Sequence, residues 1–203
     1  MIDENFNIQS LPIIEKLQSN FSNVIDLLGE NTEREGLVKT PERAAKAMKF
    51  LTSGYAIDPQ EILKGAMFKE DYKEMVIVKD IELYSLCEHH MLPFFGKAHI
   101  AYISSGNVIG LSKMNRIVEY YAKRPQVQER LTKQIVKELQ EALETDDVAC
   151  VIDAKHLCVN SRGIKDVSSS TVTSEFGGKF KYDSSTKEEF LKYIQLDTSF
   201  NGI

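Results

Sequence analysis

The sequence lacks any apolar run near the roughly 20 residues that a helix needs to cross a bilayer, so we expect no membrane-spanning segment. Its first ten residues are polar and acidic and do not resemble a secretory signal. Both features favour a cytoplasmic protein, in which disulfides rarely persist. The three cysteines are therefore expected to be metal ligands, nucleophiles or buried apolar side chains rather than bridged pairs.

Basic residues are too few for a general nucleic-acid-binding protein. Lys and Arg number 25 against 30 Asp and Glu, and the resulting net charge of −5 does not favour binding to a phosphate backbone. A local basic pocket for a phosphorylated small molecule is compatible with this balance. The chain has no internal repeat and no low-complexity tract, and 203 residues suffice for one domain with an extension.

The first third of the chain has the pattern of helices. Residues 11–28 carry apolar side chains at helical spacing, and a glycine follows them as a stop signal. The pair Thr40-Pro41 is typical of an N-cap followed by proline at the first helical position, and it predicts a helix that ends near Gly54. A second such pair at 58–59 predicts a shorter helix.

From residue 75 the pattern changes to β-rich runs, which flank a CEHH segment like the two arms of a hairpin. Two helices follow, the first expected to be capped by Ser112 and to end at Pro125. A final helix is expected over 186–196. This order predicts an α+β domain in which helices cover one face of an antiparallel sheet. The expected strands are 75–86, 96–104, 148–159 and 168–176.

Four side chains have the spacing of metal ligands. Cys87 and His90 are three residues apart, which lets one turn bring both to an ion, although a buried cysteine beside a surface histidine would have the same spacing. His156 and Cys158 are expected on one face of a strand, about 6.6 Å apart. Thiolate and imidazole ligands together favour Zn²⁺.

The number of ligands decides the class of this site. If all four residues bind, the site is closed and structural, whereas three ligands leave a position for a water molecule whose pKa the metal lowers to about 7. Spacing alone leaves both alternatives open. His89 favours the open site, because a histidine that stands beside a metal without binding it is a natural proton donor or acceptor.

A basic cluster begins the helix expected after residue 111. Ser112, Lys113 and Arg116 lie in its first turn, at the positive end of the helix dipole, where acidic residues are usually preferred. A bound anion such as a phosphate would explain two cations at this place. The alternative is a solvated basic patch.

The remaining candidates are less specific. Arg162 could bring a further cation close to the metal, and Arg43 and Lys46 form a basic pair that is more simply solvated. Glu129, next to Gln128, begins the second long helix, where a carboxylate gains from the helix dipole. The sharper interpretation is that Glu129 accepts hydrogen bonds from a purine edge such as that of guanine. Spacing does not choose between these two interpretations.

Four blocks of the sequence follow one another in a specific order: LCEHHMLPFFGKAHIAYI, VIGLSKMNRIVEYYAKRPQVQERLTKQI, HLCVNSRG and TVTSEF. They closely resemble the GTP cyclohydrolase I family, whose zinc-dependent members convert GTP into 7,8-dihydroneopterin triphosphate and formate. The resemblance runs from about Thr40 to near the C-terminus. It implies the tunnelling fold, with a four-stranded antiparallel sheet and two long helices on one face. Residues 1–72 would then form an N-terminal helical extension, and residues 73–203 the catalytic domain.

The resemblance also implies partners and a role for each candidate residue. The implied partners are GTP and nine further copies of the chain, in a homodecamer of two stacked pentamers with sites at subunit boundaries. The implied zinc ligands are Cys87, His90 and Cys158, and the implied catalytic residues are His89, His156 and Ser112. The implied guanine contacts are Glu129 and Gln128. The implied triphosphate contacts are Ser112, Lys113, Arg116 and Arg162, joined by Arg43 and Lys46 from a neighbouring subunit.

The implied reaction is the first step of pterin and tetrahydrofolate biosynthesis. Water adds to C8 of guanine while His156 helps to protonate the imidazole nitrogen. The ring opens, formate leaves, and the ribose rearranges before the pterin ring closes. His89 and Ser112 would serve proton transfers in these steps.

Overall fold

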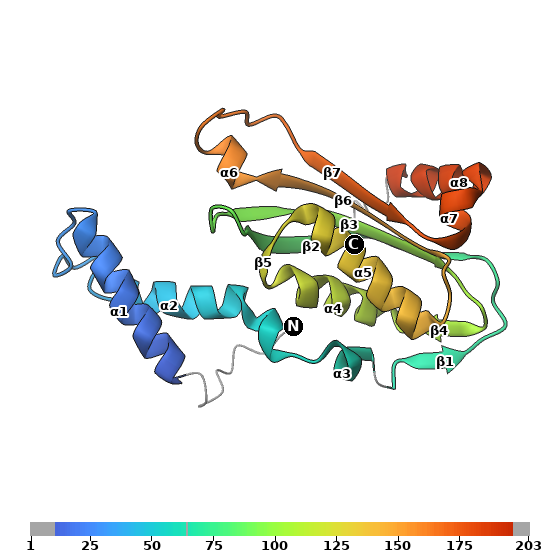
Figure 1. Cartoon of the computed structure of the whole chain (residues 1–203), viewed down its shortest axis with the longest axis horizontal. Coiled ribbons are helices and arrows are strands. Elements are labelled where there is room, and N and C mark those ends of the chain that lie inside the picture. Colours follow the sequence, from blue (N-terminus) through green and yellow to red (C-terminus); the bar gives the residue numbers. More distant parts are fainter. Residues whose placement is uncertain (1–10, 64, 197–203) are drawn as a thin grey trace, which may run out of the picture. The chain divides into compact units, whose positions relative to one another are not determined.

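The computed structural model describes residues 11–63 and 65–196 (Figure 1). The chain forms two compact units that divide between Tyr55 and Ala56. Within the described ranges, no helix combines the length and the apolar character needed to cross a membrane. Whether the catalytic domain begins at residue 73 stays a prediction.

The N-terminal unit is helical, as predicted. Helices α1 (Leu11–Leu27) and α2 (Thr40–Leu51) pack against each other, and a 3-10 turn follows at Ser53–Ala56. The prediction that Thr40 caps α2 is wrong, because Thr40 is itself helical and its Oγ1 donates to the carbonyl oxygen of Gly36 at 3.2 Å.

The second unit is built on a five-stranded sheet with the order β5-β2-β3-β6-β7. Its four longer strands are antiparallel neighbours, which confirms the predicted sheet, and the two residues of β5 add a parallel edge to β2. Strands β1 and β4 form a separate antiparallel pair. The strands are β1 (Met67–Lys69), β2 (Met75–Cys87), β3 (Pro93–Ile103), β4 (Asn107–Ile109), β5 (Pro125–Gln126), β6 (Val148–His156) and β7 (Thr171–Phe176).

Two long helices cover one face of this sheet, as predicted (Figure 1). Helix α4 packs on β2, and α5 packs on β6 and β7. Helices α7 and α8 pack against the opposite face, where Phe180 and Phe190 meet edge to face. The helices of this unit are α3 (Pro59–Leu63), α4 (Leu111–Ala122), α5 (Gln128–Leu143), α6 (Leu157–Asn160), α7 (Gly178–Tyr182) and α8 (Ser184–Gln195).

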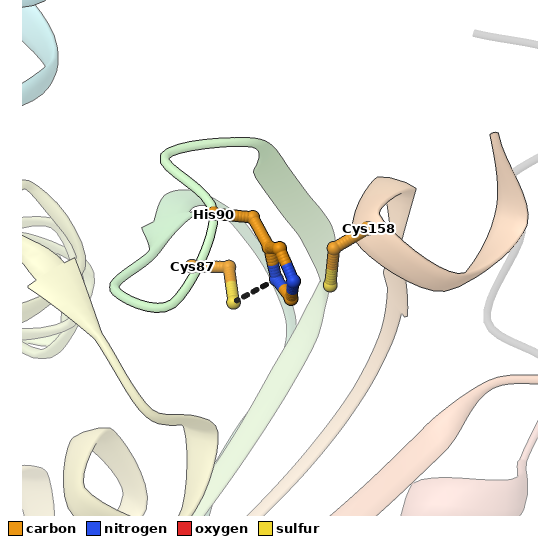
Figure 2. Close-up of side chains that lie close together, drawn as sticks. All are labelled: Cys87, His90 and Cys158. Carbon is orange, nitrogen blue, oxygen red and sulfur yellow. Dashed lines mark hydrogen bonds between the residues drawn. The ribbon is translucent and has the colours of Figure 1, made fainter. Parts of the chain in front are cut away.

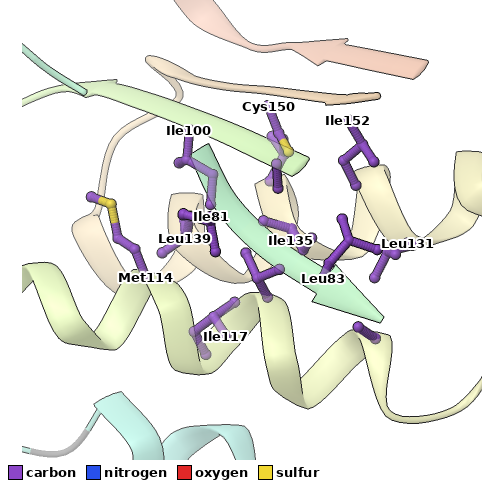
Figure 3. Close-up of a cluster of buried hydrophobic side chains, with 14 of the residues drawn as sticks. Ile81, Leu83, Ile100, Met114, Ile117, Leu131, Ile135, Leu139, Cys150 and Ile152 are labelled. Carbon is purple, nitrogen blue, oxygen red and sulfur yellow. The ribbon is translucent and has the colours of Figure 1, made fainter. Parts of the chain in front are cut away.

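The core lies between the sheet and the pair α4–α5 (Figure 3). Side chains of a strand alternate between its faces, so Ile100 points toward these helices while its neighbour Ala101 points toward α7 and α8. Leu131, Ile135 and Leu139 recur every fourth residue along α5 and are fully buried, which is the apolar face that periodicity predicted.

Two local predictions next to the candidate site are wrong. Ser112 does not cap α4, since the helix begins at Leu111 and Gly110 precedes it without a side-chain cap. The strand expected to continue to residue 159 ends at His156, and a short helical turn, α6, holds Cys158. The face-sharing and the spacing expected for His156 and Cys158 therefore do not apply.

Candidate metal centre and active site

A tight turn between β2 and β3 carries the CEHH segment. The amide of Cys87 donates to the carbonyl of Leu92 at 2.8 Å, and the amide of Met91 donates back to the carbonyl of Cys87 at 2.8 Å. Met91 has a φ of 55°, in the left-handed region that such a reversal requires. The backbone reverses here, so the rings of His89 and His90 diverge, with planes at 87° and centroids 6.3 Å apart.

The side chains of Cys87, His90 and Cys158 point toward one another (Figure 2). Their ligand atoms all lie within 4.8 Å of one another, and Cys87 Sγ is 4.0 Å from His90 Nδ1. A sulfur and a nitrogen bound to one tetrahedral Zn²⁺ stand about 3.6 Å apart. The group therefore fits this ion after a small adjustment, and two sulfurs with one imidazole are the donor set of a borderline-soft metal.

The surroundings of Cys158 disfavour ionisation of its thiol. Burial, and next the adjacent Cys87 sulfur, raise the pKa of the Cys158 thiol, while the positive charge of Arg162 opposes the change. A divalent cation would displace the thiol protons and take their place. The third cysteine, Cys150, is enclosed in the core, where burial raises its pKa, so it is an apolar core residue.

His156 stands outside the ligand group. It is the last residue of β6, and its ring stacks on that of Phe94 with centroids 4.5 Å apart and planes within 5°. Its Nε2 lies 2.7 Å from Oε1 of Gln128. Burial lowers the pKa of His156, and the negative charge of Glu129 opposes this shift. In the described part of the chain the metal-competent group thus contains three residues.

The first turn of α5 places Gln128 and Glu129 differently. The side chain of Gln128 is turned into the protein, and the residue is only 2% exposed. Glu129 is exposed and close enough to His156 for its charge to act on the imidazole. Of the two predicted guanine contacts, Glu129 is exposed to solvent and Gln128 is buried.

The predicted triphosphate contacts lie on several elements. Ser112 and Arg116 are exposed on the first turns of α4. Lys113 is half-buried, and its Nζ donates to the carbonyl oxygen of Ile62 in α3 at 2.9 Å. Arg162 is exposed in the loop that follows α6, near enough to Cys158 to affect its thiol.

Arg43 and Lys46 belong to the N-terminal unit. Both are exposed on α2, and Lys46 forms an ion pair with Glu42 of the same helix. Their contact with a triphosphate stays a prediction.

Two sets of contacts at the site were not predicted. Arg130 of α5 forms a two-pronged ion pair with Glu88, with Nη1–Oε2 and Nη2–Oε1 distances of 2.5 and 2.9 Å, and it holds the pKa of Glu88 below its usual value. The amide of Glu88 also donates to the carbonyl of Gln126 at 3.1 Å. These contacts tie the CEHH turn to β5 and α5. The second is the stacking of Phe94 on His156. Neither contact has a local sequence signal, because each joins residues more than 35 positions apart.

Comparison with known proteins gives a consistent result. The family described as GTP cyclohydrolase I matches residues 17–195 of the chain. A protein named GTP cyclohydrolase 1 from Flavobacterium johnsoniae is 60% identical over 201 residues, which cover 98% of this chain and 89% of that protein. A protein of the same name from Bacteroides fragilis is 53% identical, over 91% of this chain and 94% of that protein. Another from Porphyromonas gingivalis is 55% identical, over 88% of this chain and 92% of that protein. The extent of these matches shows that the chain belongs to the GTP cyclohydrolase I family, with its tunnelling fold.

Proposed function

We propose that this chain hydrolyses GTP at C8 of the guanine ring, releases formate and forms 7,8-dihydroneopterin triphosphate, the first step of pterin and tetrahydrofolate biosynthesis. The observation that supports this most strongly is the convergence of Cys87, His90 and Cys158 while His156 is held outside the group. Three protein ligands are typical of a catalytic zinc site, and a closed site would have taken the fourth.

Zn²⁺ would be held by the two thiolates and the imidazole of this group. When bound, the ion lowers the pKa of a water ligand to about 7, which supplies hydroxide near neutral pH. His156 then delivers a proton to the guanine nitrogen as the bond between this nitrogen and C8 opens. Burial lowers the pKa of His156 and so favours the neutral imidazole, which can accept a proton from water and pass it on. His89 and Ser112 serve the later proton transfers.

The substrate is bound at both ends. The exposed carboxylate of Glu129 accepts hydrogen bonds from the N–H groups of guanine. Cations of α4 and of the loop after α6 bind the triphosphate, and Lys113 exchanges its contact with the Ile62 carbonyl for a phosphate oxygen. Binding energy gained far from C8 holds the base in the reactive position. The proposed triphosphate contacts are Ser112, Lys113, Arg116 and Arg162, with Arg43 and Lys46 from a neighbouring subunit.

The proposal includes a homodecamer of two stacked pentamers and a cytoplasmic location. Contacts supplied by a neighbouring copy would make the assembly a requirement for full substrate binding. It includes neither a nucleic acid nor a membrane as a partner.

The test combines metal analysis with a GTP assay on the purified chain. Wild-type protein should contain zinc, release formate and produce the ultraviolet absorbance of a dihydropterin. His156→Ala should keep its zinc and lose formate release, because His156 is no ligand, whereas Cys158→Ser should lose zinc and activity together. His99→Gln, a change in β3 outside the site, is the control and should keep both.

Two results would contradict the proposal. Loss of zinc from His156→Ala would mean that His156 is a fourth ligand and the site is structural. A zinc-loaded wild-type protein that leaves GTP unchanged would exclude the reaction itself.

A further inference from the structure

The side-chain amide of Gln128 is enclosed, and its two ends can be told apart. Its Nε2 lies 3.1 Å from the carbonyl oxygen of Ile152 and 2.9 Å from that of Thr171. A carbonyl oxygen only accepts hydrogen bonds, so the end that faces these two groups must be the NH₂. The opposite end is the carbonyl oxygen Oε1, which faces Nε2 of His156 at 2.7 Å.

Two threonines support this orientation. Thr132 Oγ1 donates to the backbone carbonyl of Gln128 at 2.8 Å, so it accepts from Thr173 Oγ1 at 2.7 Å. Thr173 Oγ1 in turn accepts from Gln128 Nε2 at 3.1 Å. Turning the amide over would set its oxygen against the carbonyl oxygens of Ile152 and Thr171, and no hydrogen bond can form between groups that only accept.

The orientation of the Gln128 amide determines which nitrogen of His156 carries a hydrogen. Since Oε1 only accepts, Nε2 of His156 must carry the hydrogen, in the neutral and in the charged imidazole alike. Stacking on Phe94 fixes the plane of the ring. The other ring nitrogen, Nδ1, makes no hydrogen bond with any residue that the structure describes, so it is the nitrogen left for proton exchange.

We infer that Gln128 is a positioning residue: it fixes His156 with hydrogen on Nε2 and leaves Nδ1 to exchange a proton with the substrate. This deepens the proposed function and rests on it. It also assigns the buried side chain of Gln128 to His156 instead of to guanine. Base recognition then depends on Glu129 and on groups other than the Gln128 amide.

Kinetics separate a positioning role from a base contact. Gln128→Met keeps the length of the side chain and removes the acceptor. We expect kcat to fall about 10- to 100-fold, as for a misplaced catalytic group, while KM for GTP stays within about twofold. Gln128→Glu keeps an acceptor opposite His156 and should retain more of kcat than Gln128→Met. Gln140→Met is the matched control on the same helix, where the amide donates only to the Asp146 carbonyl, and it should behave as wild type.

Nitrogen NMR of the zinc-loaded protein, labelled with ¹⁵N in histidine, shows which ring nitrogen of His156 carries hydrogen and requires no turnover. The chain has four histidines, so His156→Asn suffices to assign the signal of His156. Wild type should carry hydrogen on Nε2 and an unprotonated Nδ1, and Gln128→Met should lose this preference. A raised KM with unchanged kcat, or an unchanged tautomer in Gln128→Met, would overturn the inference. Wild-type protein that shows the Nε2–H tautomer but no GTP turnover would instead refute the proposed reaction.

Discussion

Replacing Gly96 with alanine should push apart two strands beside the metal group. Gly96 of β3 pairs with Ala154 of β6. A Cβ at residue 96 would lie 2.0 Å from the carbonyl oxygen of Asp153 and 2.5 Å from the Cα of Ala154. Both neighbours are backbone atoms, so no side-chain rotation relieves the overlap. Ordinary carbon–oxygen contacts are about 3.3 Å, which means that the strands must separate by roughly 1.3 Å at this point.

This displacement lies close to the proposed metal ligands and to His156. His156 and Cys158 follow Ala154 by two and by four residues. Cys87 ends β2, and His90 lies in the turn that precedes β3. Overpacking of this kind costs about 1–3 kcal/mol of stability. A shift near 1 Å in the position of a catalytic group costs about 100-fold in rate. We expect Gly96→Ala to lose stability, zinc affinity and turnover together.

Three measurements on purified protein check this expectation: the urea midpoint of unfolding, zinc affinity by competition with a chromogenic chelator, and GTP turnover. Gly36→Ala is the control for the same exchange, because a Cβ there meets nothing closer than Nη1 of Arg34 at 3.6 Å. A Gly96→Ala protein that matches wild type in all three measurements would refute the claim that backbone contact between β3 and β6 sets the geometry of the site.

Two further predictions concern charge. Arg116→Ala should raise KM for GTP about 10- to 100-fold, the value of a hydrogen bond to a charged group, and leave zinc content unchanged; an unchanged KM would make Arg116 a surface charge. Burial lowers the pKa of His99 while Asp80 opposes the shift, so the unfolded state binds more protons between the lowered value and about 6.5, and stability falls as pH drops through that window. His99→Gln should flatten this fall in Tm, and an identical pH dependence in both proteins would contradict the assignment.

The sequence predicted the elements whose signals are local. Leu131, Ile135 and Leu139 recur at helical spacing, and burial of this face is what α5 contributes to the core. The hairpin β2–β3 was predicted from two β-rich runs around a turn. By contrast, β5 consists of two residues, and it exists only because Pro125 and Gln126 meet the end of β2. No pattern within two residues can predict a pairing that depends on tertiary contact.

The candidate site was predictable by residue type and only partly by arrangement. Thiol and imidazole side chains identified the metal group, since few other residues bind a borderline-soft ion. Glu88 and Arg130 were missed as a pair because long-range ion pairs have no spacing rule. Gln128 was assigned to guanine by resemblance, and its burial is a property of the fold that neighbouring residues do not reveal.

The count of metal ligands depends on where one strand ends. In an extended backbone, His156 and Cys158 would share a face and both could reach an ion, and the apolar residues on either side of Cys158 favour that strand. The chain instead leaves the extended conformation after His156, and Leu157–Asn160 form a helical turn. Cys158 consequently joins Cys87 and His90, while His156 stays against Phe94 and Gln128. The helical turn that begins after His156 thus separates a candidate centre with three ligands from one with four, and hydrophobic periodicity does not detect a change of this length.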